Sequence, residues 1–140
     1  MLPELVDSPM ETAPLKPTRH GSPLRVLIAE DDTHLRMVVR MVLESGGYEV
    51  SEARNGREAL ELIARIPFAL VIADMSMPIM TGAEMAIQLR SDPATANLPI
   101  LVMSGFAEQA ECGASAWIRK PFDADQLLAA TASMLKSGQP

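Results

Sequence analysis

The residues of this chain that could do chemistry are acids that follow two apolar runs. Asp74 ends the run L-V-I-A-D, while Glu30, Asp31 and Asp32 directly follow the run L-R-V-L-I-A. Adjacent carboxylates repel one another unless a cation or a lysine holds them together. A set of carboxylates without histidine or cysteine is typical of a site for Mg²⁺, which takes one or two carboxylates and a phosphate oxygen.

The same acids also have purely structural interpretations. Asp74 could simply begin a turn, which is a common use of aspartate. One of the three consecutive acids, or Thr33, is expected to cap the following helix. Three acids are more than a cap needs, so the acidic clusters favour a site that binds a cation.

Two further polar residues follow apolar runs nearer the C-terminus. Ser104 follows P-I-L-V-M, and Lys120 follows S-A-W-I-R. A lysine ammonium suits neutralising a phosphoryl oxygen, and a serine hydroxyl can donate a hydrogen bond to another. With the acids, this set fits transfer of a phosphoryl group to a carboxylate. Taken alone, Ser104 is more often a polar residue at a strand end.

Apolar runs alternate with helical patterns along the chain, which predicts an α/β fold with a parallel sheet and helices on both faces. Strands are predicted at residues 24–29, 48–53, 68–73, 99–103 and 115–119, and helices at 34–45, 57–65, 82–91 and after Asp123. We expect a doubly wound, five-stranded sheet in the order 2-1-3-4-5. In that order the first and third strands are neighbours, so Glu30, Asp31 and Asp74 converge at one edge.

Composition limits the classes of protein that this chain can belong to. The net charge of −6 argues against a nucleic-acid-binding surface. The single cysteine, Cys112, excludes an internal disulfide and fits a reducing cytosol. No apolar run is long enough to span a bilayer, so we expect a cytoplasmic protein without a membrane partner.

The chain is predicted to hold one domain behind a short leader. Residues 1–22 are rich in proline and have no hydrophobic period, so we expect them to be disordered. Residues 23–137 carry all the predicted strands and helices and form the domain.

Four motifs resemble the receiver domain of two-component response regulators, and they occur in the right order over residues 24–136. They are Glu30-Asp31-Asp32 after the first strand, Asp74 within D-M-S-M-P-I-M-T-G, Ser104-Gly105 after V-M, and Lys120-Pro121-Phe122 after W-I-R. The resemblance implies the receiver fold and a function in two-component or phosphorelay signalling.

The resemblance also implies an acceptor and a metal site. Asp74 would accept a phosphoryl group from a histidine kinase or a histidine phosphotransfer protein. Glu30, Asp31, Asp74 and the backbone carbonyl of Ser76 would hold Mg²⁺ as the cofactor. Glu30 stands where the family more often has aspartate, and the longer side chain should be tolerated.

The remaining residues of the resemblance form a phosphoryl-sensing set. Lys120 would pair with the phosphoryl group, and its peptide bond to Pro121 would be cis. Ser104 would bind a phosphoryl oxygen, and Trp117 would act with it as the switch aromatic. Trp117 alone would be interpreted as half-buried packing.

One stretch departs from the family pattern. The chain between Ser104 and Lys120 is shorter than usual, and residues 106–114 leave room for only a turn or two of helix. The fourth helix is therefore expected to be shortened or missing. This segment could be mobile and become ordered on phosphorylation.

The sequence therefore predicts a regulatory phosphoacceptor that acts as a conformational switch or phosphoryl shuttle. We do not expect an enzyme beyond self-phosphorylation and self-dephosphorylation. No DNA-binding or catalytic module follows the last helix, so we expect a stand-alone receiver with an unidentified downstream protein target. A monomer is expected, with dimerisation on phosphorylation left open.

Other functions stay open as alternatives. The chain could be the receiver segment of a hybrid histidine kinase, or a protein-binding module that works without phosphorylation. An aspartate-based phosphatase typically has a second aspartate two residues after its nucleophile, where this chain has Ser76. Flavin binding is disfavoured because the loop after the first strand is acidic.

Overall fold

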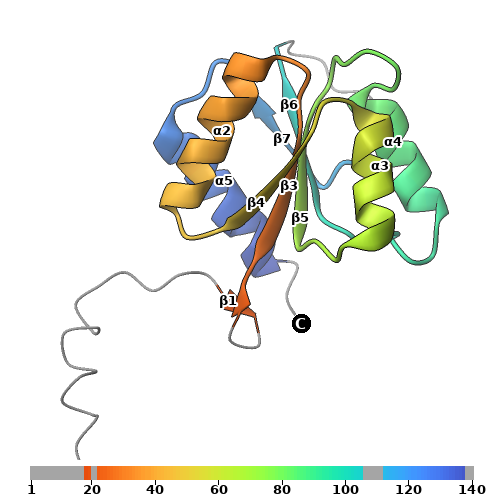
Figure 1. The fold of residues 1–140 in the computed structure, drawn as a ribbon, viewed down its shortest axis with the longest axis horizontal. Coiled ribbons are helices and arrows are strands. Elements are labelled where there is room, and N and C mark those ends of the chain that lie inside the picture. Colours follow the sequence, from red (N-terminus) through yellow and green to blue (C-terminus); the bar gives the residue numbers. More distant parts are fainter. Residues whose placement is uncertain (1–17, 20–21, 106–111, 138–140) are drawn as a thin grey trace, which may run out of the picture.

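The computed structural model describes residues 18–19, 22–105 and 112–137, and its main feature is a five-stranded sheet (Figure 1). The strands are, in spatial order, β4 (Glu49–Ala53), β3 (Arg25–Ala29), β5 (Leu70–Asp74), β6 (Ile100–Ser104) and β7 (Ala116–Arg119). All four pairings are parallel. Counted from β3 as the first strand, this is the predicted 2-1-3-4-5 order of a doubly wound α/β fold.

Helices cover both faces of this sheet (Figure 1). They are α2 (Thr33–Ser45), α3 (Gly56–Arg65), α4 (Gly82–Ser91) and α5 (Ala124–Ser137). The side chains of α2 and α5 pack into the core on one face, and those of α3 and α4 into the core on the other. Strands that are buried on both faces must be apolar throughout, which explains the uninterrupted apolar runs in the sequence.

The register of the central strands fixes where the acids lie. Ala29 of β3 is paired with Ala73 of β5, so Glu30 and Asp74 each come one residue later at the same edge of the sheet. Asp74 is the last residue of β5 rather than the first residue beyond it, and Ser104 ends β6 in the same way. The predicted convergence of the first and third strand ends is confirmed.

Helix caps account for one of the consecutive acids. The side chain of Asp32 accepts hydrogen bonds from the backbone N–H groups of His34 and Leu35, so it is the N-cap of α2. At α4, Thr81 and Glu84 form a reciprocal capping box. Because Asp32 is occupied as a cap, Glu30 and Asp31 remain to face a cation.

The N-terminal part of the described chain has a feature that the sequence pattern does not show. Thr18–Arg19 (β1) pairs with Ser22–Pro23 (β2) as a two-stranded antiparallel ladder. The extended conformation favoured before a proline, and the tolerance of proline at sheet edges, fit Ser22 and Pro23 in such a ladder. Disorder is predicted for residues 1–22, but positions 18, 19 and 22 belong to this ladder, and 1–17 and 20–21 lie outside the described residues.

The connection between β6 and β7 is described only in part. Residues 106–111, where we expect a shortened or missing helix, lie outside the described residues. Residues 112–115, which lead into β7, contain no helix. None of the described helices has the length and apolar content to cross a bilayer.

Candidate functional site

Three carboxylates meet at the edge of the sheet where β3 and β5 end. One oxygen from each of Glu30, Asp31 and Asp74 lies within 4.8 Å of the other two. Glu30 is 2% exposed and Asp74 5% exposed, whereas Asp31 faces solvent. Buried carboxylates at this spacing need positive charge beside them to stay ionised.

Lys120 supplies part of that positive charge. Its Nζ lies 2.5 Å from Oδ1 of Asp74 and 3.6 Å from Oε1 of Glu30. Burial alone would lower the pKa of Lys120, but the hydrogen bond and charge of Asp74, helped by Glu30, raise that pKa. Lys120 therefore stays charged, and one ammonium stands against three carboxylates. We call Glu30, Asp31, Asp74 and Lys120 the acid site.

Glu30 shows that this balance favours a further cation. Burial, with the nearby charge of Asp74, raises the pKa of Glu30 to about 7, although the Asp32 amide opposes this shift. Oε2 of Glu30 accepts a hydrogen bond of 3.1 Å from that amide, whereas Oε1 is buried without a hydrogen-bond donor among the described residues. Three carboxylates, one of which has a buried oxygen without a hydrogen-bond donor among the described residues, fit Mg²⁺, a hard cation that prefers oxygen ligands.

The loop after Asp74 approaches that residue closely. The backbone N–H of Ser76 donates to Oδ2 of Asp74 at 3.2 Å, and the N–H of Gly82 donates to the carbonyl of Met75 at 3.1 Å. A Cβ atom on Gly82 would lie 2.3 Å from the carbonyl oxygen of Asp74, closer than real contacts allow. Glycine at position 82 is therefore required by the close approach. Ser76, the predicted carbonyl ligand, lies in the turn directly beyond Asp74.

Ser104 and Lys120 are joined through the backbone. Ser104 is 3% exposed, and its carbonyl accepts a hydrogen bond of 2.7 Å from the N–H of Lys120. Met103 of β6 is paired with Asp74 of β5. Ser104, the next residue of β6, therefore lies one position beyond Asp74 at the end of the sheet where the acids meet. The Lys120–Pro121 peptide bond is cis, as the resemblance implies.

Trp117 lies within β7, an outer strand of the sheet, and not at the carboxyl ends of the strands where the acids meet. It is paired with Val102 of β6, is half-buried, and packs against the core on the α3 and α4 face. The structure therefore brings Glu30, Asp31, Asp74 and Lys120 together with Ser104 beside them, and it leaves Trp117 in the adjoining strand.

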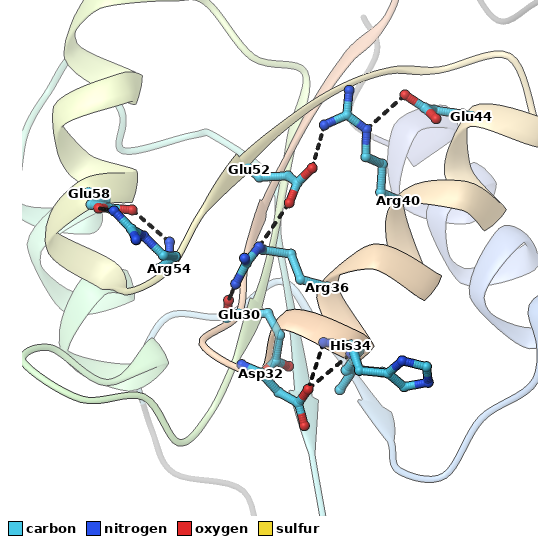
Figure 2. Close-up of polar contacts among 10 residues, drawn as sticks. Glu30, Asp32, His34, Arg36, Arg40, Glu44, Glu52, Arg54 and Glu58 are labelled. Carbon is cyan, nitrogen blue, oxygen red and sulfur yellow. Dashed lines mark hydrogen bonds and ion pairs between the residues drawn. The ribbon is translucent and has the colours of Figure 1, made fainter.

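One residue at the site was missed by sequence reasoning. Arg36 on α2 donates from Nη1 to the backbone carbonyl of Glu30 at 2.7 Å and from Nε to Oε1 of Glu52 at 2.8 Å (Figure 2). The only signal was an arginine one turn into a helix that follows the acids, which on its own is typical of a solvated surface charge.

The arrangement has the parts of a phosphoryl acceptor. Asp74 offers a carboxylate at the end of a strand, and Lys120 offers an ammonium that can pair with a phosphoryl oxygen. Glu30 and Asp31 offer further oxygens to a divalent cation. Neither histidine nor cysteine is among the described residues placed at this site, and its carboxylates are the candidate acceptors.

Comparisons with known proteins identify the family of this chain. The model of the response regulator receiver domain family matches residues 26–132. Response regulator MprA of Mycolicibacterium vanbaalenii is 37% identical over 124 residues, which cover 84% of this chain and 53% of that protein. The chain thus spans about half the length of the curated relatives it matches.

Solved structures agree in fold. The chemotaxis response regulator CheY4 of Vibrio cholerae is 31% identical, with a TM-score of 0.76 over 81% of this chain and 99% of that chain. The receiver domain of the sensor histidine kinase PA1611 of Pseudomonas aeruginosa has a TM-score of 0.78 at 21% identity over 82% of this chain and 99% of that chain. That structure holds a magnesium ion in its active site cleft, and at this identity the likeness shows the fold alone. On the family match, the sequence identity and the fold together, the chain belongs to the receiver domain family of two-component response regulators.

Proposed function

We propose that Asp74 of this receiver domain accepts a phosphoryl group from a phosphohistidine protein, with Mg²⁺ bound at the acid site. The observation that carries the proposal is the contact between Lys120 Nζ and Asp74 Oδ1, at 2.5 Å, within a cluster of three carboxylates. A buried aspartate held by a lysine beside a cation site is suited to receive a charged group, because charge stabilisation and positioning dominate phosphoryl transfer.

Each residue has a separate task in this proposal. An oxygen of Asp74 attacks phosphorus, a new O–P bond forms, and the N–P bond of the phosphohistidine breaks, with its electron pair returning to the imidazole. Lys120 pairs with an oxygen of the incoming group, and the Ser104 hydroxyl donates to another. Glu30, Asp31, Asp74 and the carbonyl of Ser76 would hold Mg²⁺, which when bound supplies positive charge to the phosphoryl oxygens.

The modification would act through the neighbouring strands. A backbone hydrogen bond links Lys120 to Ser104. A displacement of either residue would therefore shift the start of the connection between β7 and α5. Trp117 precedes Lys120 by three residues and would report this change as the switch aromatic. The chain would then be a conformational switch or a phosphoryl shuttle, with no catalysis beyond accepting and hydrolysing the phosphoryl group.

The partners follow from this chemistry. We propose a histidine kinase or a histidine phosphotransfer protein as the donor and a protein as the downstream target. A receiver segment of a hybrid histidine kinase remains the alternative, since the solved receiver domain of a signal transduction histidine kinase is 28% identical to this chain. A cytoplasmic location remains a prediction from the sequence, which has a single cysteine and no apolar run long enough to span a bilayer.

Intact-mass measurement after incubation with Mg²⁺ and acetyl phosphate tests the proposal. We expect wild-type protein to gain one phosphoryl group, and Asp74→Asn to gain none. Asp125→Asn, at an exposed position of α5, serves as the matched control and should behave as wild type. A wild type that binds Mg²⁺ but gains no mass would favour the alternative of a binding module that works without phosphorylation.

A further inference from the structure

Arg36 fixes the backbone of the residue that carries the most buried acid of the site. Its Nη1 donates to the carbonyl oxygen of Glu30 at 2.7 Å, and the N–H of Glu30 donates to the carbonyl of Ala53 at 3.0 Å. The backbone N–H and the backbone carbonyl of Glu30 are therefore both hydrogen-bonded, the first to the neighbouring strand β4 and the second to the Arg36 side chain. The Arg36 side chain is only 11% exposed, so water competes weakly for this bond.

Arg36 is itself held in place by a chain of charges (Figure 2). Its Nε donates to Oε1 of Glu52 on β4 at 2.8 Å. Oε2 of Glu52 accepts from Arg40, whose Nε also donates to Glu44 at 2.9 Å. An arginine fork with two fixed acceptors loses less freedom for each hydrogen bond than a flexible side chain does. The guanidinium of Arg36 is thus set before any ligand binds.

The side chain of Glu30 depends on this hold. Oε2 is used by the Asp32 amide, while Oε1 has no hydrogen-bond donor among the described residues and faces Lys120 at 3.6 Å. Glutamate has one more rotatable bond than aspartate, so where Oε1 lies depends more strongly on where its backbone is fixed. Partners that orient a metal ligand are worth about 10–100-fold in metal affinity.

We infer that Arg36 is a positioning residue for Mg²⁺, which acts by holding the Glu30 peptide and does not touch the ion. The inference rests on the proposed function, because it needs a cation at the acid site. Arg40 provides the contrast, since it shares Glu52 with Arg36 but has no hydrogen bond to Glu30 among the described contacts.

Calorimetric titration of the full chain with MgCl₂ tests the inference. We expect Arg36→Gln to raise the Kd for Mg²⁺ at least about tenfold. Arg36→Lys keeps one donor and the charge, and should recover part of the affinity. Arg40→Gln should raise the Kd by no more than about twofold, because Arg40 acts on Arg36 only through Glu52 and its own ion pairs are partly exposed.

A second readout separates positioning from a general loss of structure. At saturating Mg²⁺ the rate of phosphorylation by acetyl phosphate should return to the wild-type value in Arg36→Gln, while the Mg²⁺ concentration for half-maximal rate rises by the same factor as the Kd. Equal Mg²⁺ affinity in Arg36→Gln and wild type, or an equal loss in Arg40→Gln, would overturn the inference. A wild type that binds no Mg²⁺ would instead remove the proposed metal site, and this inference with it.

Discussion

Two parts of the acid site are held in different ways. We call Glu30 with Arg36, Arg40 and Glu52 the Glu30 corner, and residues 75–82 the Asp74 loop. In the Glu30 corner, charged side chains of α2 and β4 fix the main chain (Figure 2). The Asp74 loop is held by backbone hydrogen bonds instead. One of them joins the N–H of Gly56 to the carbonyl of Met80 at 3.3 Å.

The difference teaches which perturbations each part can feel. Ion pairs weaken with salt and with protonation of their carboxylates, so the Glu30 corner can be adjusted by solution conditions. The backbone hydrogen bonds of the Asp74 loop carry no ionisable group and respond to neither, but the close approach at Gly82 leaves no room for added volume. The main chain that follows Asp74 is therefore held by shape and backbone hydrogen bonds, whereas the main chain of Glu30 is held by charged side chains. The Asp74 carboxylate itself is paired with Lys120.

The largest effect is expected in the Asp74 loop. Gly82→Ala would place Cβ 2.3 Å from the Asp74 carbonyl oxygen, which the loop can avoid only by moving. We expect a loss of about 3 kcal/mol in the free energy of unfolding, measured in urea. Gly105→Ala is the control, because its Cβ would meet no atom of the described residues within 4 Å. Equal stability of the two variants would mean that the loop is not held by shape.

A second variant should make the same loop more stable. Ile79 has a φ of 69°, and the N–H of Met80 donates to the carbonyl of Pro78 at 2.6 Å across it. A β-branched residue is strained in this conformation, whereas asparagine adopts it readily. Ile79→Asn should raise the free energy of unfolding by about 1 kcal/mol.

Ile87 offers a control for that gain. It is 51% exposed in α4, so Ile87→Asn also removes an exposed isoleucine but relieves no left-handed backbone. If thermal or urea unfolding shows the same change for both variants, the stabilisation comes from surface polarity and not from the loop conformation.

The stabilising contribution of the Glu30 corner should decrease at low pH. Hydrogen bonds from Arg40 and Arg36 hold the pKa of Glu52 below its ordinary value of 4.5. The folded state is therefore favoured above that value, and this contribution is lost as the pH falls through the lowered pKa. Glu52→Gln should cost less than about 1 kcal/mol near neutral pH and flatten the acid limb of the stability curve. A variant with an unchanged acid limb would contradict the assignment.

The smallest effect is expected from an exposed pair outside the Glu30 corner. Arg54 and Glu58 lie 3.2 Å apart, and the arginine side chain is 72% exposed. Arg54→Gln should change the free energy of unfolding by no more than about 0.5 kcal/mol, and added salt should remove the difference. A larger loss of stability would show that exposed ion pairs also stabilise this protein. The Glu30 corner would then not differ from other charged pairs in its dependence on charge.

The sequence alone was sufficient to predict the parallel sheet and the position of the acids at one edge of it. Strands buried on both faces are apolar throughout, and the acids that end them mark the edge of a parallel sheet. The patterns predicted a cap by one of the three acids or Thr33, which the structure assigns to Asp32, and they predicted Asp74 at a strand end. The two-residue ladder of Thr18–Arg19 with Ser22–Pro23 was not, because it is too short to produce a periodic signal.

Long-range contacts explain what the sequence did not reveal. Arg36 and Glu52 are separated by 16 positions, and nothing in the local pattern of α2 shows that one will meet the other. Ile79 gave a misleading local signal, since a β-branched residue argues against a positive φ. Gly82 looked like an ordinary helix start until the approach to Asp74 showed why a side chain cannot fit there.

Locating the phosphoryl group tests the central claim most directly. After incubation with acetyl phosphate and Mg²⁺, borohydride reduces an acyl phosphate of aspartate to homoserine, which tandem mass spectrometry assigns to a position in the chain. Asp74 as the acceptor predicts homoserine at position 74 in the wild type. Homoserine at Asp31 or at another acid, with position 74 unmodified, would contradict the account.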